Sequence, residues 1–295
     1  MKKKSTPPEP PSPPQEEAAR PLIQADEEII LKLTKDLKTA TKSLNQHEAR
    51  FLVDTYYQMQ GNRIRAREQI RSMEKSGEPH AVLDWLFSKS KILEGQIAAA
   101  LKAYVSTKEP CVWAMRQKGI GPIISAGLYS RIDISRAPTV GHIWSYAGLN
   151  PNAVWEKGQK RPWNAALKKL CWLIGESFVK VSGRDNAYYG KLYVERKAYE
   201  EQKNLLGAYK AIADVRATKV GKDTIAYSHY SKGFLPPAHI HSRAKRYAVK
   251  LFLAHFHEVW YKDHFKKDPP LPYPIAHLGH AHKMEVPMGD EDDED

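Results

Sequence analysis

The fold depends on residues 119–128, which read Gly-Ile-Gly-Pro-Ile-Ile-Ser-Ala-Gly-Leu. A Gly-apolar-Gly turn here leads into a helix of small residues, because glycine accepts positive φ and Pro122 suits the first position of a helix. Backbone N–H groups at a helix start, aided by the helix dipole, attract anions. We interpret the stretch as a helix-hairpin-helix-like phosphate clamp; an ordinary helix hairpin is the alternative. Its predicted DNA-binding residues are Gly119, Ile120, Gly121 and Ser125.

A second glycine turn and a basic run follow the first turn. Residues 148–151 read Gly-Leu-Asn-Pro, and the segment beyond them is rich in lysine and arginine. Such cations attract phosphates whatever the base sequence. The predicted DNA-binding residues of this run are Lys157, Lys160, Arg161, Lys168 and Lys169. Aromatic residues among the cations would either stack on bases or pack in the core: Trp155, Trp163, Tyr188 and Tyr189.

Helical periodicity dominates the chain on both sides of these turns. From about residue 25 to residue 104, apolar residues recur at i, i+3 and i+4, which predicts two or three long helices. Residues 164–181 form the clearest amphipathic helix, with Asn164 as its N-cap. Another strong helix opens at His241, with His255 on its buried face. Strand signals are weak, so we expect a mainly α protein: an N-terminal long-helix hairpin or coiled coil plus a compact helix-hairpin-helix-like α domain.

These patterns divide the chain into five parts. Residues 1–24 are rich in Pro, Glu and Lys, and we expect a disordered tail there. Residues 25–108 form the coiled-coil-like part, in which an arginine cluster is either a solvated helix face or a nucleic-acid contact. Residues 109–206 form the helix-hairpin-helix domain, 207–268 a helical extension, and 269–295 a Pro- and His-rich segment with an acidic end. The arginines are Arg63, Arg65, Arg67 and Arg71.

Composition favours a polyanionic partner. The 295 residues carry a net charge of +12, and because residues 290–295 are all acidic, residues 1–289 carry +18. Nucleic acid is the commonest partner of such a chain, although many basic proteins bind none. The two cysteines, Cys111 and Cys171, make no disulfide framework, which fits a reducing cytoplasm. No apolar run approaches the ~20 residues that span a bilayer, so we expect a cytoplasmic protein without a membrane partner.

Four motifs in this order resemble a known family. They are Gly-Ile-Gly-Pro at 119–122, Ile-Asp-Ile-Ser-Arg at 132–136, Tyr-Ala-Gly-Leu-Asn-Pro at 146–151 and Gly-Gln-Lys-Arg at 158–161. Together they resemble the C-terminal transposase domain of the bridge-RNA-guided insertion-sequence transposases (the one-hundred-and-ten family), over roughly residues 112–200. The resemblance implies a DNA-binding, transposase-like protein of a mobile element or phage, located in the bacterial cytoplasm and acting in DNA transposition or recombination.

The chain departs from that family in two places. The family has a RuvC-like α/β domain with four acidic residues at its N-terminus, whereas the first hundred residues here read as helices. The family also carries a nucleophilic serine just before the Gly-Lys hinge, but residues 146–176 contain no serine. Ser177 fits packing or solvent exposure better than catalysis, since it has no evident partner to activate it. The catalytic residues are therefore unknown, and whether the chain is an enzyme stays open.

No cofactor is evident, and Mg²⁺ enters only if the chain is catalytic. Asp133, Glu156, Glu176 and Asp185 would then be its candidate ligands, although scattered acids are usually solvated. The pattern His277-x-x-His280-x-His282 is too weak to assign a metal site. The expected partners are the DNA phosphate backbone, RNA as an alternative, and a second copy bound through the N-terminal helices. Two further interpretations are a non-catalytic nucleic-acid scaffold and a helical protein-interaction module.

Overall fold

The protein is mainly α-helical. The computed structural model describes residues 33–151, 153–271 and 284–289, and no strand occurs in these ranges. The predicted disordered tail, the His277-x-x-His280-x-His282 pattern and the acidic end at 290–295 lie outside the described residues. The helices, with one 3₁₀ turn η1, are α2 (Lys35–Thr41), α3 (Gln46–Ser76), α4 (Ala81–Val105), α5 (Glu109–Met115), α6 (Pro122–Arg131), η1 (Ile134–Arg136), α7 (Val140–Tyr146), α8 (Ala165–Val181), α9 (Tyr188–Leu205), α10 (Lys210–Ala217), α11 (Ile225–Tyr230) and α12 (Pro237–Phe265).

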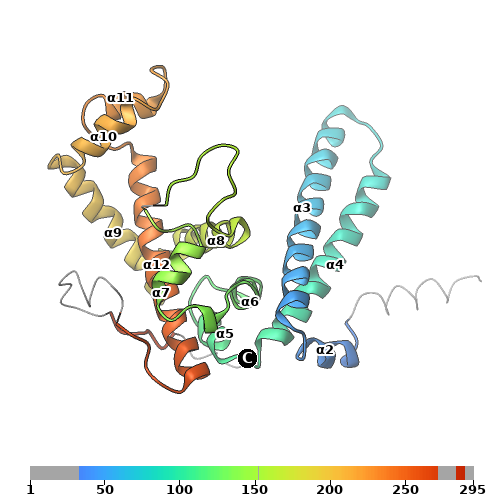
Figure 1. Cartoon of the computed structure of the whole chain (residues 1–295). Helices are drawn as coiled ribbons and strands as arrows, with labels where there is room; N and C mark the ends of the chain where they lie inside the picture. The colour runs from blue at the N-terminus through green and yellow to red at the C-terminus, as the bar shows by residue number, and fades with distance from the viewer. Residues whose placement is uncertain (1–32, 152, 272–283, 290–295) are drawn as a thin grey trace, which may run out of the picture.

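The two longest N-terminal helices, α3 and α4, lie antiparallel as a hairpin whose far end projects away from the rest of the molecule (Figure 1). Asn45 starts α3 with a capping box to Glu48, and Gly77 ends it in the left-handed conformation. An ion pair between the Arg63 Nε and a Glu94 carboxylate oxygen, 2.5 Å apart, ties the helices together. The apolar side chains Val82, Trp85 and Leu93 of α4 remain exposed, and the self-association expected through these helices stays a prediction.

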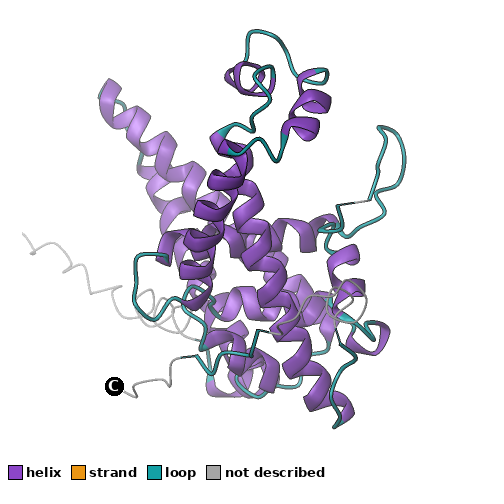
Figure 2. Ribbon diagram, turned by 90° about the vertical axis from the view of Figure 1, so that its left-hand side faces the viewer, coloured by secondary structure: helices purple, strands orange, loops and turns teal. Residues whose placement is uncertain are grey.

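The main core is built around α12. Phe252 of α12 stacks on Trp113 of α5, with 5.7 Å between ring centroids, and meets Phe178 of α8 and Tyr189 of α9 edge-on. Helices α5, α7, α8 and α9 surround α12 (Figures 1 and 2). Residues on both sides of the predicted boundary at residue 206 therefore share this core, since α12 packs there with residues of α5, α7, α8 and α9. Periodicity identifies a buried helix face without identifying the helices that cover it.

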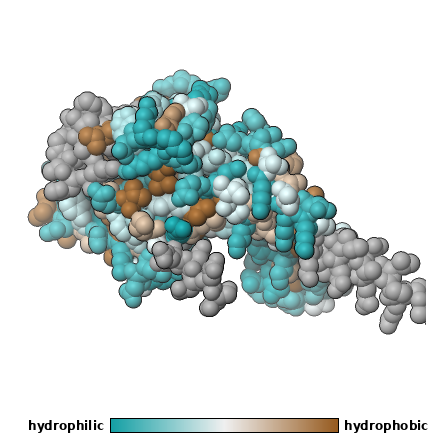
Figure 3. All heavy atoms as spheres, turned by 90° about the horizontal axis from the view of Figure 1, so that it is seen from below, coloured by the Kyte–Doolittle hydropathy of each residue, from teal (hydrophilic) through white to brown (hydrophobic). Residues whose placement is uncertain are grey.

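A smaller apolar cluster joins the hairpin to this body. Val53 of α3 and Tyr104 of α4 pack against Cys111 and Ala126, which belong to α5 and α6. The boundary predicted at residue 108 is thus also a packed junction. The space-filling view from below shows a mostly hydrophilic surface, with hydrophobic residues gathered in the left-hand part of the view (Figure 3). In the part of the chain that the structure describes, no helix combines the length and the apolar character needed to cross a bilayer.

The described C-terminal segment, residues 284–289, packs back onto the core. Met284 and Val286 contact the main apolar cluster, and the Trp113 indole N–H donates to the Pro287 carbonyl at 2.9 Å. His255 of α12 links this segment to α9, since its Nε2–H donates to the Met284 carbonyl and its Nδ1 accepts from the Tyr189 hydroxyl. His255 is thus a buried structural residue, as its place on the apolar helix face predicts.

Buried histidines make the stability of this core sensitive to acid. His257 of α12 is 3% exposed, and its Nε2–H donates to the Ala137 carbonyl at 2.8 Å. Burial lowers the pKa of His257 below 6.5, and burial likewise lowers the pKa of His239 and His241. The unfolded chain therefore takes up protons that the folded chain does not. The stabilisation is complete above about pH 6.5 and is lost as the pH falls below it.

We expect the midpoint temperature of thermal unfolding to decrease as the pH is lowered from about 7.5 to about 5.5, the range in which unperturbed histidines titrate. Differential scanning calorimetry at fixed ionic strength measures this midpoint. His257→Gln keeps an N–H donor but removes the titrating ring, so the midpoint of this variant should fall less. An equal fall in both proteins would contradict the assignment to His257.

Candidate nucleic-acid interface

The Gly119–Gly121 turn packs against the C-terminal half of α8. Gly119 has a φ of +95°, and a Cβ at this position would lie 3.0 Å from the Ser177 Oγ and 3.2 Å from a Val181 methyl. The Ser177 hydroxyl donates a hydrogen bond to the Gly119 carbonyl. The turn needs glycine as the sequence predicts, and the helix behind it begins at Pro122. The side of the turn at Gly119, however, faces a neighbouring helix.

Two predicted contact residues are enclosed. Ile120 is 5% exposed and packs in the main core, and Ser125 is 0% exposed on the inward face of α6. The Ser125 hydroxyl has no hydrogen-bond partner within the described ranges. The structure therefore corrects the prediction that these two side chains contact DNA. The cause is that α6 packs against α3, α4 and α8, a contact that the spacing of small residues does not reveal.

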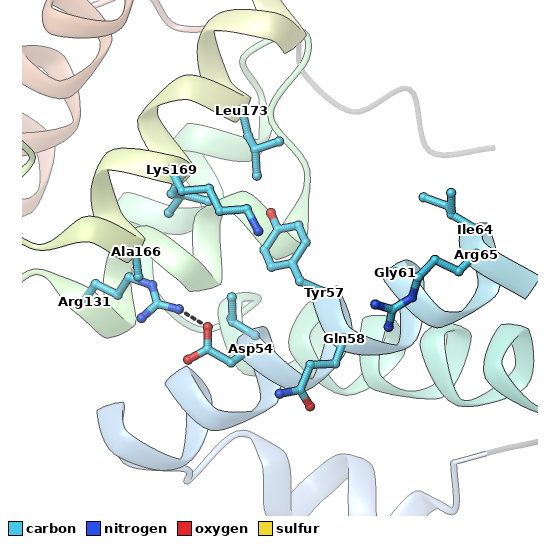
Figure 4. Close-up of a pocket in the computed structure, with 12 residues that line it drawn as sticks. Asp54, Tyr57, Gln58, Gly61, Ile64, Arg65, Arg131, Ala166, Lys169 and Leu173 are labelled. Carbon is cyan, nitrogen blue, oxygen red and sulfur yellow. Dashed lines mark hydrogen bonds and ion pairs between the residues drawn. The ribbon is translucent and has the colours of Figure 1, made fainter.

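Lys168 and Lys169 leave α8 in different directions. Lys169 faces α3, where its Nζ lies 5.6 Å from the centre of the Tyr57 ring. It lines a cleft of about 720 Å³ between α3 and α8. The same cleft holds the ion pair between Arg131 and Asp54, at 2.5 Å, and the exposed Arg65 (Figure 4). Burial raises the pKa of the Tyr57 hydroxyl to about 12, so Tyr57 stays neutral there.

Lys168 lies instead over an indole at the second glycine turn. Its Nζ is 4.0 Å from the centre of the Trp163 ring. Gly148 has a φ of +66°, and a Cβ there would lie 2.8 Å from Trp163, so only glycine lets the indole sit on this turn. The Asn164 side chain caps α8 directly after Trp163, as the sequence predicts. The second glycine turn thus positions a tryptophan and, through it, a lysine.

The same arrangement recurs three times in the neighbourhood. A cation lies over the ring in three further pairs: Lys250 over Trp144 at 4.1 Å, Arg161 over Trp155 at 5.2 Å and Lys245 over Trp172 at 5.8 Å. The four pairs together involve four of the seven tryptophans of the chain. We call this surface, with Arg246, the cation–tryptophan face.

Like charges are held together on this face. Burial and then the neighbouring Arg246 lower the pKa of Lys168 and of Lys250. Burial and then two further arginines lower the pKa of Arg246. Lys245 has an anionic partner in Glu176, whereas no ion pair to Lys168, Arg246 or Lys250 occurs among the residues that the structure describes. Neighbouring cations without a counter-charge create a positive potential that favours the approach of an anion.

The loop between α7 and α8 extends this face. Residues 153–162 are all exposed and project from the body (Figures 1 and 2). The Trp155 indole N–H donates to the Gln159 carbonyl at 2.8 Å, which closes the tip of the loop. Lys157 and Lys160 therefore stand in solvent beside Arg161.

The structure thus places the predicted DNA-binding residues of the basic run in different surroundings. It brings Arg161 and Lys168 together, leaves Lys157 and Lys160 on the adjacent loop, and turns Lys169 toward α3. The sequence did not indicate that α7, α12 and the exposed side of α8 contribute to the cation–tryptophan face. On α12 the missed signal was the i, i+4 spacing of Arg246 and Lys250, outside the apolar face. The missed residues are Trp144, Trp172, Lys245, Arg246 and Lys250.

The described residues hold no group of three or more His, Cys, Asp or Glu side chains arranged to bind a metal ion. No protein-family model, no curated protein and no solved structure matches this chain. The site is therefore interpreted from its own chemistry, which is that of a basic surface with indole rings.

The geometry of the first turn predicts a stability effect. Gly119→Ala places a methyl group against Ser177 and Val181 in a left-handed backbone, and should lower the free energy of unfolding by about 1–3 kcal/mol. Gly121→Ser is the matched control, since Gly121 is an N-cap with a φ of −109° and nothing within 4 Å of a Cβ. Urea denaturation measures both variants. Equal stability of the two would show that the turn is not fixed by α8.

Proposed function

We propose that this protein binds DNA through the cation–tryptophan face. The observation that supports the proposal is the group of neighbouring cations Lys168, Arg246 and Lys250. Both lysines lie over indole rings, and none of the three cations has an ion-pair partner among the described residues. Phosphates supply that counter-charge, and indoles supply surfaces on which bases stack. The net charge of +18 on residues 1–289 favours the same partner.

We further propose that this binding serves DNA transposition or recombination. Two of the four motifs of the transposase resemblance, at 146–151 and 158–161, contribute directly to the face. Gly148 seats Trp163, and Arg161 lies over Trp155. A chemical role for these motifs in contacting DNA agrees with the function that the resemblance implies.

A non-catalytic DNA scaffold is a second candidate, favoured by one observation. Residues 146–176 contain no serine, and the Ser177 hydroxyl donates to the Gly119 carbonyl within a packed contact. A serine held in this way is a structural residue. Within the described residues the segment before Gly158 offers Val154, Trp155, Glu156 and Lys157, none of which matches the expected nucleophile.

The binding proposal predicts a defined salt dependence. Lys168→Gln combined with Arg246→Gln removes two phosphate contacts, so the slope of log Kd against log salt for duplex DNA should become shallower by about 1.8. Fluorescence anisotropy of the full chain between about 50 and about 200 mM salt measures the slope. Lys75→Gln combined with Lys102→Gln, which neutralises two exposed lysines of the hairpin, is the control and should leave the slope unchanged. The proposal fails if the wild type binds no DNA at low salt.

Covalent trapping separates the transposase from the scaffold. The full chain is incubated with Mg²⁺ and labelled duplex and four-way DNA, then denatured and resolved by electrophoresis. For the scaffold we expect bound DNA to be released without an adduct, because the described residues place no hydroxyl with an activating base at the face, and the Ser242 hydroxyl there donates to the Ala238 carbonyl. A denaturation-resistant protein–DNA adduct excludes the scaffold and assigns a nucleophile. Ser177→Ala tests whether that nucleophile is Ser177.

A further inference from the structure

A small pocket lies within the cation–tryptophan face, between α8 and α12. Its volume is about 260 Å³. The floor is apolar and includes Cys171 and Val249, which are both buried, while Trp172 forms one wall and is 58% exposed. Lys168 and Arg246 line it as well. The pocket therefore combines a flat aromatic wall, an apolar floor and two cations, Lys168 and Arg246, without an ion-pair partner in the described part of the chain.

This combination fits a particular kind of ligand. A bare phosphate needs the cations but gains nothing from an apolar floor or from an exposed indole. A base pair in duplex DNA keeps its ring faces stacked on neighbouring pairs, so only the base edges and the backbone reach the protein. An unstacked base presents a ring face to Trp172 and stays joined to a phosphate. The volume lies below the ~300–1,000 Å³ of pockets for drug-sized ligands, which suits a unit of about one base.

The surrounding contacts keep the pocket in this form. Lys245 lies 5.8 Å from the Trp172 ring and is ion-paired with Glu176, which holds it beside the indole. Trp163 holds the Lys168 side chain, because the Nζ of this lysine lies over its ring. Arg246 follows the buried Ala244 by two residues on α12, so packing of α12 in the core fixes where this arginine emerges.

We propose that this pocket receives one unstacked base of single-stranded DNA, with the base on Trp172 and its phosphate between Lys168 and Arg246. The proposal rests on the proposed function and adds the substrate class: DNA with a single-stranded or unpaired nucleotide, in preference to intact duplex. The exposed indole then has a binding role, and the neighbouring cations gain the counter-charge that the described residues do not supply.

Two tryptophan variants of similar exposure test the proposal in the full chain. Trp172→Ala should weaken binding of a thymidine oligonucleotide about 10- to 100-fold, the effect of losing one aromatic stack. It should weaken binding of a duplex of equal length by a clearly smaller factor, because paired bases keep their ring faces stacked on one another. Trp85→Ala removes an indole that is 60% exposed on the hairpin and should change neither affinity. Trp172→Phe should restore most of the loss, because a phenyl ring also stacks.

A readout without any variant covers the case in which Trp172→Ala folds poorly. A 2-aminopurine base in the oligonucleotide should lose fluorescence when it stacks on the indole, whereas the same base in duplex should change little on binding.

The outcomes separate this inference from the function beneath it. If Lys168→Gln with Arg246→Gln weakens binding while Trp172→Ala has no effect, or affects single strand and duplex equally, the pocket is overturned and DNA binding stands. If the wild type binds no DNA at low salt, both proposals fall. Tighter binding of the corresponding RNA oligonucleotide than of DNA overturns the assignment of DNA as the occupant.

Discussion

The burial of α12 is the constraint on which the rest of the structure depends. Phe252, Phe256 and Trp260 of this helix fill the main core. On a helix each residue turns about 100°, so Arg246, two residues from the buried Ala248, must face the opposite way. The packing that stabilises the body thereby fixes the direction of Arg246, and Lys250 follows it by about one turn. A rotation of α12 would both expose these aromatic rings and move Arg246 and Lys250 away from the other cations.

This arrangement explains how the fold sustains a surface of like charges. Each exposed charge interaction is worth about 0.2–1 kcal/mol, whereas burying one large apolar side chain contributes about 1.5–3 kcal/mol. The three buried aromatic residues of α12 outweigh the repulsion from Arg246, which adds to burial in lowering the pKa of Lys168 and Lys250. This repulsion is small, and the binding of an anion would relieve it, which supports the proposal of a phosphate ligand.

Local rules predicted much of the fold, and tertiary contacts account for what they missed. The mainly α class, the start of α6 at Pro122 and the cap at Asn164 follow from periodicity and capping chemistry. The sequence could not show that α12 joins the core of residues 109–205, since a buried helix face does not name its partner. For the same reason the sequence does not show that Ser125, a polar residue among small ones, is buried. Nor does it show that Trp144 pairs with Lys250, which lies 106 positions further along the chain.

The placement of α8 separates two roles that the sequence motifs do not distinguish: support of the first glycine turn and formation of the cation–tryptophan face. Lys168 and Ser177 are nine residues apart, so their side chains leave opposite sides of α8 and are separated by roughly 13 Å along the helix axis. Ser177 holds the first glycine turn, whereas Lys168 belongs to the cation–tryptophan face. One phosphate cannot contact both. The Gly119 turn therefore packs against the opposite side of α8, and changes there would act on the proposed DNA binding only through stability. The second glycine turn contacts Trp163 directly, so changes at Gly148 would alter the proposed binding surface itself.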